Sequence, residues 1–416
     1  MTKARVVITG MGAVTALGAN WKAFSASLRA NRSGVRKAPE LADLGGMNTR
    51  LAAPIDDFEL PAHYTRKKTR SMGRVSLLAT RSTEFALAEA GLVDDEILRS
   101  GRVGLSYGST SGSPPAMAKY ASAMLESKTI KGIRATDYIQ LMSHTTAANL
   151  AQFFGVTGRV ITTCSACTSG SQGIGYGYES IASGAQDIMI TGGAEEFHAI
   201  DAAVFDIMFA TSTRNDEPEK TPRPFDAERD GLVVGEGAGT LILESLDHAL
   251  EREAPIFAEI VGYGTNCDGL HITNPDEGGM ARVMELALES ADVTPDEIAY
   301  LNAHGTATEA GDIAESIAME KVFGERLPTS SLKSFIGHTL GASGAIEAWA
   351  TIEMQRSGWF APTLNLDRVD DRCGRLDYIR GQGREIDAPL VMSNNFAFGG
   401  INTSLIFRRW DSADAR

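Results

Sequence analysis

The sequence predicts an α/β fold built from two related halves. Short β-branched apolar strands alternate with helical stretches along all 416 residues, as in α/β proteins. In each half a strand leads into a loop of small and reactive residues, a glycine-rich helix follows, and another strand comes later. Because such loops meet at one crevice in α/β proteins, we expect the functional site between the halves.

The expected elements follow from apolar periodicity and from the turn residues that bound each run. The expected strands are Arg5–Thr9, Val103–Tyr107, Arg159–Thr162, Asp187–Thr191, Ala238–Glu244, Phe257–Tyr263, Tyr300–Asn302, Leu390–Ser393 and Thr403–Phe407. The expected helices are Trp21–Ala30, Val75–Ala90, Thr145–Phe154, Ser171–Ser183, Gly279–Ala291, Ile313–Phe323 and Ala342–Arg356. Segments 30–65 and 211–230 contain Pro, Asp and Arg and are expected to be long connections. We expect the first half to comprise residues 1–250 and the second half residues 251–416.

Composition excludes several classes of protein. The net charge of −14 argues against broad nucleic-acid binding, which needs a basic face. No run approaches the roughly 18 apolar residues that span a bilayer, so no membrane segment is expected. The first residues enter a strand pattern directly, without the apolar region of a signal peptide. Four cysteines make no disulfide framework, so we expect a cytoplasmic protein.

Cys167 is the most informative residue. It follows the β-branched run Val160–Thr163 and precedes a stretch rich in glycine and serine that starts a helix. Free amides and the positive end of the helix dipole would lower the pKa of a thiol at that turn and activate it as a nucleophile. The alternative is a small buried cysteine in a tight turn. A zinc site is not expected, because Cys267 and Cys373 add no second pair to Cys164 and Cys167.

Three further runs carry reactive or turn residues. His304 follows a strand in a loop of glycine and threonine, and Lys333 and His338 precede a helix. An aromatic and glycine turn, Asn394–Asn402, follows a strand. A single histidine is more often a packing or surface residue, but two at equivalent loops and a thiol at a third are more specific. Two neutral imidazole N–H groups would stabilise the enolate oxygen that forms when a malonyl thioester loses CO₂, and an acyl-cysteine would be the electrophile.

The chain resembles the β-ketoacyl-acyl-carrier-protein synthases of the elongating type. The resemblance extends from the Val6-Ile-Thr-Gly-Met-Gly opening to Leu405-Ile-Phe. It rests on the combination of Cys-Thr-Ser-Gly, Asn-Ala-His-Gly-Thr, Lys-Ser-x-x-Gly-His and Phe-x-Phe-Gly-Gly. It implies the thiolase fold, five layers in the order αβαβα made of two related halves, and a homodimer.

The resemblance assigns the catalytic roles by position. Cys167 matches the acyl-accepting nucleophile, because Ala precedes it and Thr-Ser-Gly follows, and Cys164 is expected to be a packing residue. His304 and His338 match the pair that assists decarboxylation and binds the thioester oxygen. Lys333 matches the lysine that organises the site electrostatically.

Supporting roles are implied in the same way. The amides of Cys167 and Phe398 would form the oxyanion hole, and Phe398 would be a gate over the acyl pocket. The remaining implied positions are Phe396 and Gly399 in the gate turn, Thr306 and Thr308 on the phosphopantetheine arm, and Asp312 and Glu347 in a charge network near Lys333. No cofactor and no metal are expected, because the substrates are carried on the phosphopantetheine of acyl carrier protein.

Basic residues gather at two places in this acidic chain. They are Arg66, Lys67, Lys68 and Arg70, and the looser group Lys128, Lys131 and Arg134. Solvated helix faces are the commoner explanation. The resemblance places Arg66–Arg70, Lys128 and Lys131 where the family docks its acidic carrier protein, which favours docking.

Several positions differ from the family pattern. Ala397 stands where the gate turn usually has glycine, and Ala307 and Glu309 replace the usual Ser and Pro. Since Ala397 reaches positive φ only at a cost, we expect the gate to move less or differently. Thr110 and Ser111 fall where other members line the acyl pocket with Ile or Gly, and a more polar pocket suits an unsaturated or aryl-bearing chain.

The leading interpretation is an elongating ketosynthase of fatty-acid synthesis that uses acyl and malonyl thioesters. The alternative is a ketosynthase of a polyene, aryl-polyene or polyketide pathway, working as a heterodimer with a related subunit. An inactive chain-length factor is disfavoured because Cys167, His304, Lys333 and His338 are all present. A coenzyme A thiolase is disfavoured because no second catalytic cysteine follows Cys373.

Overall fold

The computed structural model describes residues 3–126 and 128–411. Within those residues a mixed sheet of eleven strands crosses the molecule in the order β13-β11-β10-β15-β16-β9-β1-β8-β6-β4-β5. The strands are β1 (Val6–Thr15), β4 (Val103–Gly108), β5 (Val160–Thr163), β6 (Ile188–Glu195), β8 (Gly237–Ser245), β9 (Ala258–Cys267), β10 (Tyr300–Asn302), β11 (Pro328–Ser330), β13 (Asp377–Tyr378), β15 (Leu390–Phe396) and β16 (Ile401–Arg409). Short strands form two small sheets: β2 (Arg36–Lys37), β3 (Leu51–Ala53) and β7 (Val234–Gly235), and β12 (Trp359–Phe360) with β14 (Arg384–Glu385).

Helices connect these strands. They are α1 (Trp21–Arg29), α2 (Pro39–Ala42), α3 (Arg66–Thr69), α4 (Arg74–Glu89), α5 (Pro114–Leu125), α6 (Ala135–Leu141), α7 (Thr145–Phe154), α8 (Ser169–Ala182), α9 (Ala199–Ile207), α10 (Leu246–Glu251), α11 (Glu277–Ala291), α12 (Glu309–Phe323), α13 (Lys333–Ile336) and α14 (Ser343–Ser357). No helix among the described residues is long and apolar enough to cross a membrane.

The sheet repeats itself, which confirms the prediction of two related halves. In the order β1-β8-β6-β4-β5, β4 is parallel to β5 and β6, and β8 is antiparallel to β6 and β1. In the order β9-β16-β15-β10-β11, β10 is parallel to β11 and β15, and β16 is antiparallel to β15 and β9. The halves join where Val6–Ile8 pairs with Ala258–Ile260. The predicted boundary after residue 250 falls inside the last turn of α10 (Leu246–Glu251), shortly before β9 begins.

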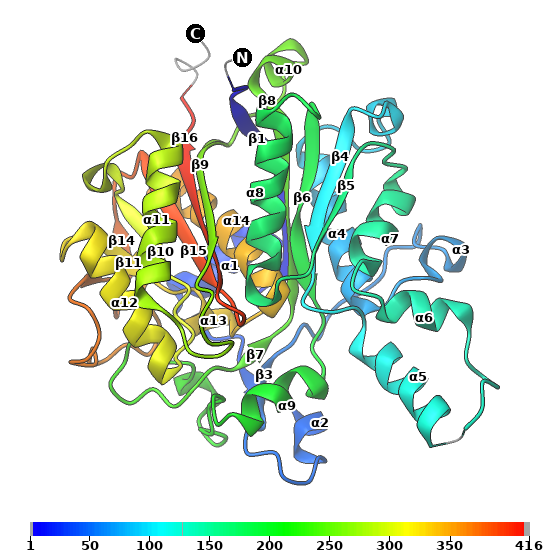
Figure 1. Ribbon diagram of the computed structural model, residues 1–416, viewed down its shortest axis with the longest axis horizontal. Coiled ribbons are helices and arrows are strands. Elements are labelled where there is room, and N and C mark those ends of the chain that lie inside the picture. The colour runs from blue at the N-terminus through cyan, green and yellow to red at the C-terminus, as the bar shows by residue number, and fades with distance from the viewer. Residues whose placement is uncertain (1–2, 127, 412–416) are drawn as a thin grey trace.

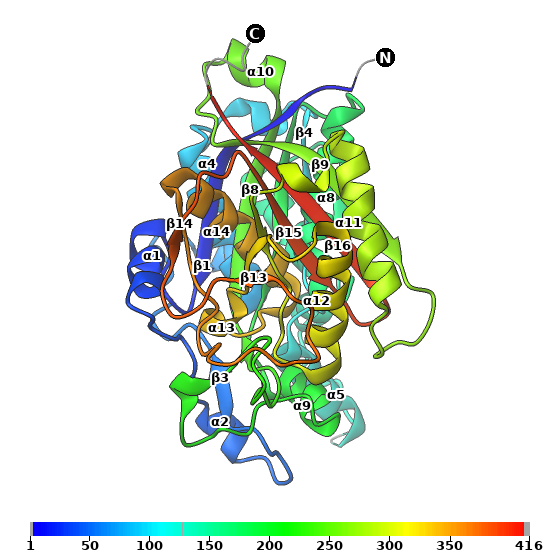
Figure 2. The same cartoon turned by 90° about the vertical axis from the view of Figure 1, so that its left-hand side faces the viewer.

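The helices make the structure five layers thick, as predicted. Helices α8 and α14 pack against each other and against strands of both halves, so they form the central layer. Helices α4 and α7 cover the outer face of the first half (Figure 1). Helices α11 and α12 lie side by side on the outer face of the second half (Figure 2). The glycine-rich loops before α8 and α14 therefore meet inside the molecule.

Every expected strand and helix is present, with differences at some ends. Strand β1 continues to Thr15, because Gly10 and Gly12 lie under α4 instead of forming a turn, and a Cβ at Gly10 would be 2.2 Å from the Ala86 carbonyl oxygen. Helix α12 starts at Glu309 instead of Ile313. Helices α5, α6 and α9 and the short helices α2, α3, α10 and α13 were not predicted. The segment 30–65, expected to be a long connection, contains β2, α2 and β3. The α5–α6 pair projects from the body, and Leu125 of α5 is exposed (Figure 1). The apolar residues of this pair therefore do not all lie on one buried face, which is the pattern that predicts a helix from sequence.

Candidate active site

A strained turn places Cys167 at the start of α8. Strand β5 ends at Thr163, Ala166 has a left-handed φ of 49°, and the single 3₁₀ turn Ala166–Thr168 leads into α8. A left-handed non-glycine residue costs about 1–2 kcal/mol, so the surrounding packing holds this turn in place. The Cys167 side chain is 5% exposed, and it lies at the amide end of the helix as predicted.

The second half repeats this turn before α14. Leu340 has a φ of 47°, and the 3₁₀ turn Leu340–Ala342 leads into α14. Gly341 occupies the position equivalent to Cys167, and a Cβ there would lie 2.6 Å from the amide nitrogen of Thr110. The second half therefore has glycine, with no side chain, at the position equivalent to Cys167. His338 lies just before this turn.

The geometry determines which nitrogen of His338 carries the proton. Its Nε2 lies 2.9 Å from Cys167 Sγ, and its Nδ1 accepts a hydrogen bond of 3.2 Å from the backbone N–H of Leu340. A backbone N–H can only donate, so Nδ1 has the lone pair and Nε2 has the hydrogen. His338 therefore directs an N–H group at the sulfur and at the space beside it.

His304 has the same tautomer for a different reason. The Asn395 amide nitrogen donates to Glu347 Oε2 at 2.7 Å and lies 3.4 Å from His304 Nδ1. The carboxylate fixes the orientation of the amide, so Nδ1 of His304 is the acceptor and Nε2 carries the hydrogen. The two imidazole rings lie 5.2 Å apart at 89°. Two N–H groups from separate loops therefore face one cavity.

A buried ion pair sets the charge of the site. Lys333, 1% exposed, contacts Glu347 of α14 through its ammonium group. Burial and the Lys333 ammonium hold the pKa values of both His304 and His338 well below the usual range. Both imidazoles are therefore neutral at pH 7, as the sequence-based chemistry requires.

The prediction of a depressed thiol pKa is wrong. Burial raises the pKa of Cys167 to about 12, although the Lys333 ammonium and the amides of Cys167 and Phe398 act in the opposite direction. Removal from water outweighs these stabilising groups because a thiolate loses most of its solvation inside the protein. The resting site therefore holds a thiol.

The Phe398 turn lines the same cavity as Cys167. The backbone amides of Phe398 and Cys167 act as donors that lower the pKa of the Cys167 thiol, and their role as an oxyanion hole stays a prediction. Gly399 and Gly400 have φ values of 89° and 72°, whereas Ala397 stays outside the left-handed region in this conformation. The predicted cost of Ala397 therefore does not arise in the conformation described.

These residues line one cavity of about 590 Å³. It is lined by the predicted residues Cys167, His304, Thr306, Thr308, His338, Phe396 and Phe398. It is also lined by Phe205 of α9, which was not predicted and whose ring lies 5.4 Å from that of Phe398. Residues from both halves therefore meet in one crevice, as predicted.

Comparison with known proteins identifies the family. Residues 3–249 match the family described as "Beta-ketoacyl synthase, N-terminal domain", and residues 257–367 match "Beta-ketoacyl synthase, C-terminal domain". The chain belongs to the β-ketoacyl synthase family. The resemblance found in the sequence, and with it the thiolase fold, is confirmed.

Relatives match this ketosynthase over nearly its full length. It is 39% identical to 3-oxoacyl-[acyl-carrier-protein] synthase 1 of Escherichia coli, over 97% of this chain and 99% of that one. A β-ketoacyl synthase structure from Burkholderia phymatum is 58% identical, with a TM-score of 0.97 over 98% of this chain and 100% of that one. The structure of the ishigamide ketosynthase/chain length factor is 33% identical, with a TM-score of 0.90 over 98% and 100%.

The two carboxylates predicted to support Lys333 have different positions in this ketosynthase. Glu347 pairs with Lys333 as expected. Asp312 instead accepts hydrogen bonds from the Ala307 and Phe225 amides. Sequence reasoning did not identify Glu315, three residues further along α12, although acidic residues spaced three apart at a helix start were a usable signal.

The predicted acyl-pocket residues lie beside Cys164. The Thr110 amide donates to Glu195 at 2.8 Å, and the Thr110 carbonyl accepts from Cys164 Sγ. Within the described residues, neither Thr110 nor Ser111 lines the 590 Å³ cavity, so their role in the acyl pocket stays a prediction. Cys164 is exposed at the end of β5, so the expectation that it packs in the interior is wrong for a single chain.

The predicted docking residues are all at the surface. Arg66, Lys67 and Lys68 form α3, Arg70 follows, and Lys128 and Lys131 lie between α5 and α6. Among the described residues no ion pair is found for any of these six cations. Lys68 contacts the ring of Phe153. They are therefore available to an acidic partner.

Cys167, His304 and His338 also form a group of possible metal ligands. In the described part of the chain their donor atoms lie within 4.8 Å of one another. A metal needs a lone pair on each imidazole, whereas both Nε2 atoms carry hydrogen and Lys333 adds positive charge nearby. The donor chemistry therefore favours a substrate oxygen over a cation.

Alkylation should reveal the raised thiol pKa. Since the pKa of Cys167 is about 12, its thiolate fraction should rise about tenfold per pH unit from pH 7 to 9. The rate of iodoacetamide labelling at Cys167, followed by peptide mass spectrometry, should rise with the same slope and reach no plateau in that range. A plateau near pH 7 would show that the amides and Lys333 outweigh burial.

Proposed function

We propose that this β-ketoacyl synthase condenses an acyl chain held on Cys167 with malonyl-acyl-carrier protein, releasing 3-oxoacyl carrier protein and CO₂ in fatty-acid elongation. The observation that carries the proposal is the convergence of a thiol and two N–H-bearing imidazoles in one cavity. The names of the curated relatives support the same reaction.

Acyl transfer begins the cycle. Cys167 Sγ attacks the carbonyl of the incoming thioester, and the amides of Cys167 and Phe398 stabilise the oxyanion that forms. The C–S bond to pantetheine breaks, and the thiol proton leaves on the pantetheine sulfur. Because Nε2 of His338 already carries hydrogen, His338 donates a hydrogen bond to the Cys167 sulfur and does not act as the base that deprotonates it.

Decarboxylation produces the carbon nucleophile. When the malonyl group loses CO₂, negative charge collects on the thioester oxygen. The Nε2–H groups of His304 and His338 are donors positioned for that oxygen, and both rings are neutral before the reaction. The carbanion then attacks the acyl-Cys167 carbonyl, a C–C bond forms, and the released thiolate takes up a proton from water.

The remaining sites follow from this reaction. Thr306 and Thr308, whose hydroxyls lie 2.9 Å apart, line the cavity and would hydrogen-bond the pantetheine arm. The carrier protein supplies the substrate on this arm, and Cys167, His304 and His338 carry out acyl transfer and decarboxylation. The six exposed cations on α3 and between α5 and α6 would dock the acidic carrier.

We further propose a homodimer that pairs through the edge of β5. Within the described residues β5 ends the sheet, and its Val160 side chain is 43% exposed. An exposed apolar sheet edge is an unfavourable feature of a monomer. Leu125 and Ile130 of the projecting α5–α6 segment add exposed apolar surface. We propose that the protein is located in the cytoplasm.

A ketosynthase of a polyene or polyketide pathway is the second candidate. The ishigamide ketosynthase/chain length factor matches over nearly the full length, and Thr110 and Ser111 are polar where an acyl pocket is expected. In that case the subunit facing β5 would be a related chain instead of a second copy. An inactive chain-length factor stays disfavoured, because Cys167, His304, Lys333 and His338 are assembled in one site.

Intact mass spectrometry with acyl carrier proteins tests the function. The wild type should gain one acyl group and, with malonyl carrier protein, form 3-oxoacyl carrier protein. Cys167→Ala should abolish both, whereas Cys164→Ala should keep both. Acylation that persists in Cys167→Ala but not in Cys164→Ala would overturn the assignment. Loading of polyenoyl but not saturated chains would favour the second candidate.

Charge reversal tests the docking site. Lys67→Glu with Lys68→Glu should raise KM for the carrier about tenfold at low salt, and the difference should shrink as salt screens the charges. Lys22→Glu with Lys321→Glu gives the same change in net charge at exposed positions elsewhere and should leave KM unchanged. Equal effects of both pairs would show that only net charge matters.

Sedimentation velocity tests the dimer. The purified 44.3 kDa chain should sediment with twice that mass. Val160→Lys should shift the population toward monomer, because it places a charge on the proposed shared edge. Val93→Lys, at a position that is also half exposed, should not. A monomeric wild type would contradict self-pairing.

A further inference from the structure

Two carboxylates of α12 divide the loop 304–308 between them. Glu315 accepts hydrogen bonds of 2.7 Å from the amides of both His304 and Gly305. Asp312 accepts one of 3.1 Å from the amide of Ala307. The part of the loop that carries the catalytic imidazole therefore depends on one acid, and the part that carries Thr306 and Thr308 depends on the other.

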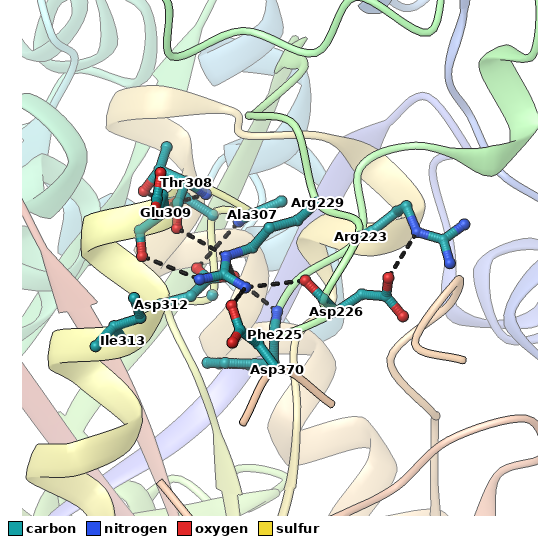
Figure 3. Close-up of polar contacts among 12 residues, drawn as sticks. Arg223, Phe225, Asp226, Arg229, Ala307, Thr308, Glu309, Asp312, Ile313 and Asp370 are labelled. Atoms are coloured by element: carbon teal, nitrogen blue, oxygen red, sulfur yellow. Dashed lines mark hydrogen bonds and ion pairs between the residues drawn. The ribbon is translucent and has the colours of Figure 1, made fainter. Parts of the chain in front are cut away.

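Arg229 holds the second part of this loop. Its side chain is 2% exposed, and it comes from the connection between α9 and β7. Its guanidinium donates to the carbonyl oxygens of Thr308 at 3.3 Å and Glu309 at 3.1 Å, and lies 3.7 Å from Asp312 Oδ2 (Figure 3). A planar fork with five N–H groups can serve these acceptors at once, which a lysine cannot.

Arg229 is itself anchored on the opposite side. It donates to Asp370 Oδ2 at 2.7 Å and to the Asp226 carbonyl oxygen at 2.9 Å. Asp312 is anchored too, because its Oδ2 accepts from the Phe225 amide at 2.7 Å. The guanidinium thus links three chain segments that are far apart in sequence (Figure 3).

The loop needs this support because it is strained. Ala307 has a φ of 66°, a left-handed conformation that costs a residue with a Cβ about 1–2 kcal/mol. Its amide is tied to Asp312, and the next two carbonyls are tied to Arg229. Without these contacts Ala307 would relax to ordinary φ, and the adjacent Thr306 and Thr308 hydroxyls would turn away from the cavity.

We propose that Arg229 is a positioning residue that sets the affinity for the pantetheine arm by fixing Thr306 and Thr308. The inference rests on the proposed function, in which these threonines bind that arm. Because Glu315 holds His304 independently, Arg229 governs KM for the carrier-bound substrates and leaves kcat nearly unchanged.

Arg223 offers a matched control on the same connection. It is likewise a buried arginine, 7% exposed, and it pairs with Asp226 (Figure 3). It also pairs with Asp367. Among the described residues no hydrogen bond or ion pair is found between Arg223 and the loop 304–308. Loss of Arg223 therefore removes a comparable buried charge without releasing Thr306 or Thr308.

Kinetics of Arg229→Gln, Arg229→Lys and Arg223→Gln with malonyl carrier protein test the proposal. Arg229→Gln should raise KM about tenfold, the equivalent of one or two lost hydrogen bonds, and keep kcat within about twofold. Arg229→Lys should restore part of the affinity, and Arg223→Gln should leave KM within about twofold of wild type. A lowered kcat at unchanged KM, or an equal rise of KM in Arg223→Gln, would overturn the proposal.

Two measurements keep the test independent of turnover. Iodoacetamide labelling of Cys167 should be unchanged in Arg229→Gln, because Cys167 lies on a different loop. Amide hydrogen exchange in peptides covering residues 304–309 should accelerate in Arg229→Gln but not in Arg223→Gln. Equal exchange rates in Arg229→Gln and Arg223→Gln would overturn the positioning role. If Arg229→Gln is too unstable to measure, Arg229→Lys takes its place in the same comparison. A wild type without condensing activity but with the expected exchange difference would instead refute the proposed function.

Discussion

The buried ion pair between Lys333 and Glu347 is the interaction on which the rest of the site depends. Burying two charges is costly, and such a pair is rarely kept for stability alone. Here each member has a second effect. The Lys333 ammonium helps to keep His304 and His338 neutral, and Glu347 orients the Asn395 amide that fixes the tautomer of His304. Loss of either partner would leave an unpaired charge among the groups that bind the thioester oxygen.

The internal repeat explains how the site is divided. Each half supplies a residue with left-handed φ, a 3₁₀ turn and a central helix, so two similar turns face each other across the crevice. One turn carries Cys167, and the other carries Gly341, because Thr110 and Glu195 fill the space that a side chain would need. The second half instead provides the histidines and the lysine. A single half therefore cannot hold both the acyl chain and the groups that activate the malonyl thioester.

The electrostatics of Cys167 shows a limit of reasoning from local structure. The position at the start of α8 was predicted correctly, and a helix terminus does favour a thiolate. Burial has the larger effect here and keeps the sulfur protonated. A protonated resting thiol is consistent with acyl transfer, since the proton can leave with the pantetheine sulfur during the exchange. Exposure of a side chain depends on packing between the halves, which the turn motif does not encode.

The sequence by itself determined the alternation of strands and helices, the two-half organisation and the identity of Cys167, His304, Lys333 and His338. These features are local, because periodicity, turn residues and short motifs are written in neighbouring positions. Tertiary structure alone decided the tautomers, the raised thiol pKa, the exposure of Cys164 and the roles of Glu315, Asn395 and Arg229. Each of these depends on contacts between residues far apart in the chain, such as Arg229 with Asp370 or His338 with Cys167, and such contacts exist only after the two halves have packed together.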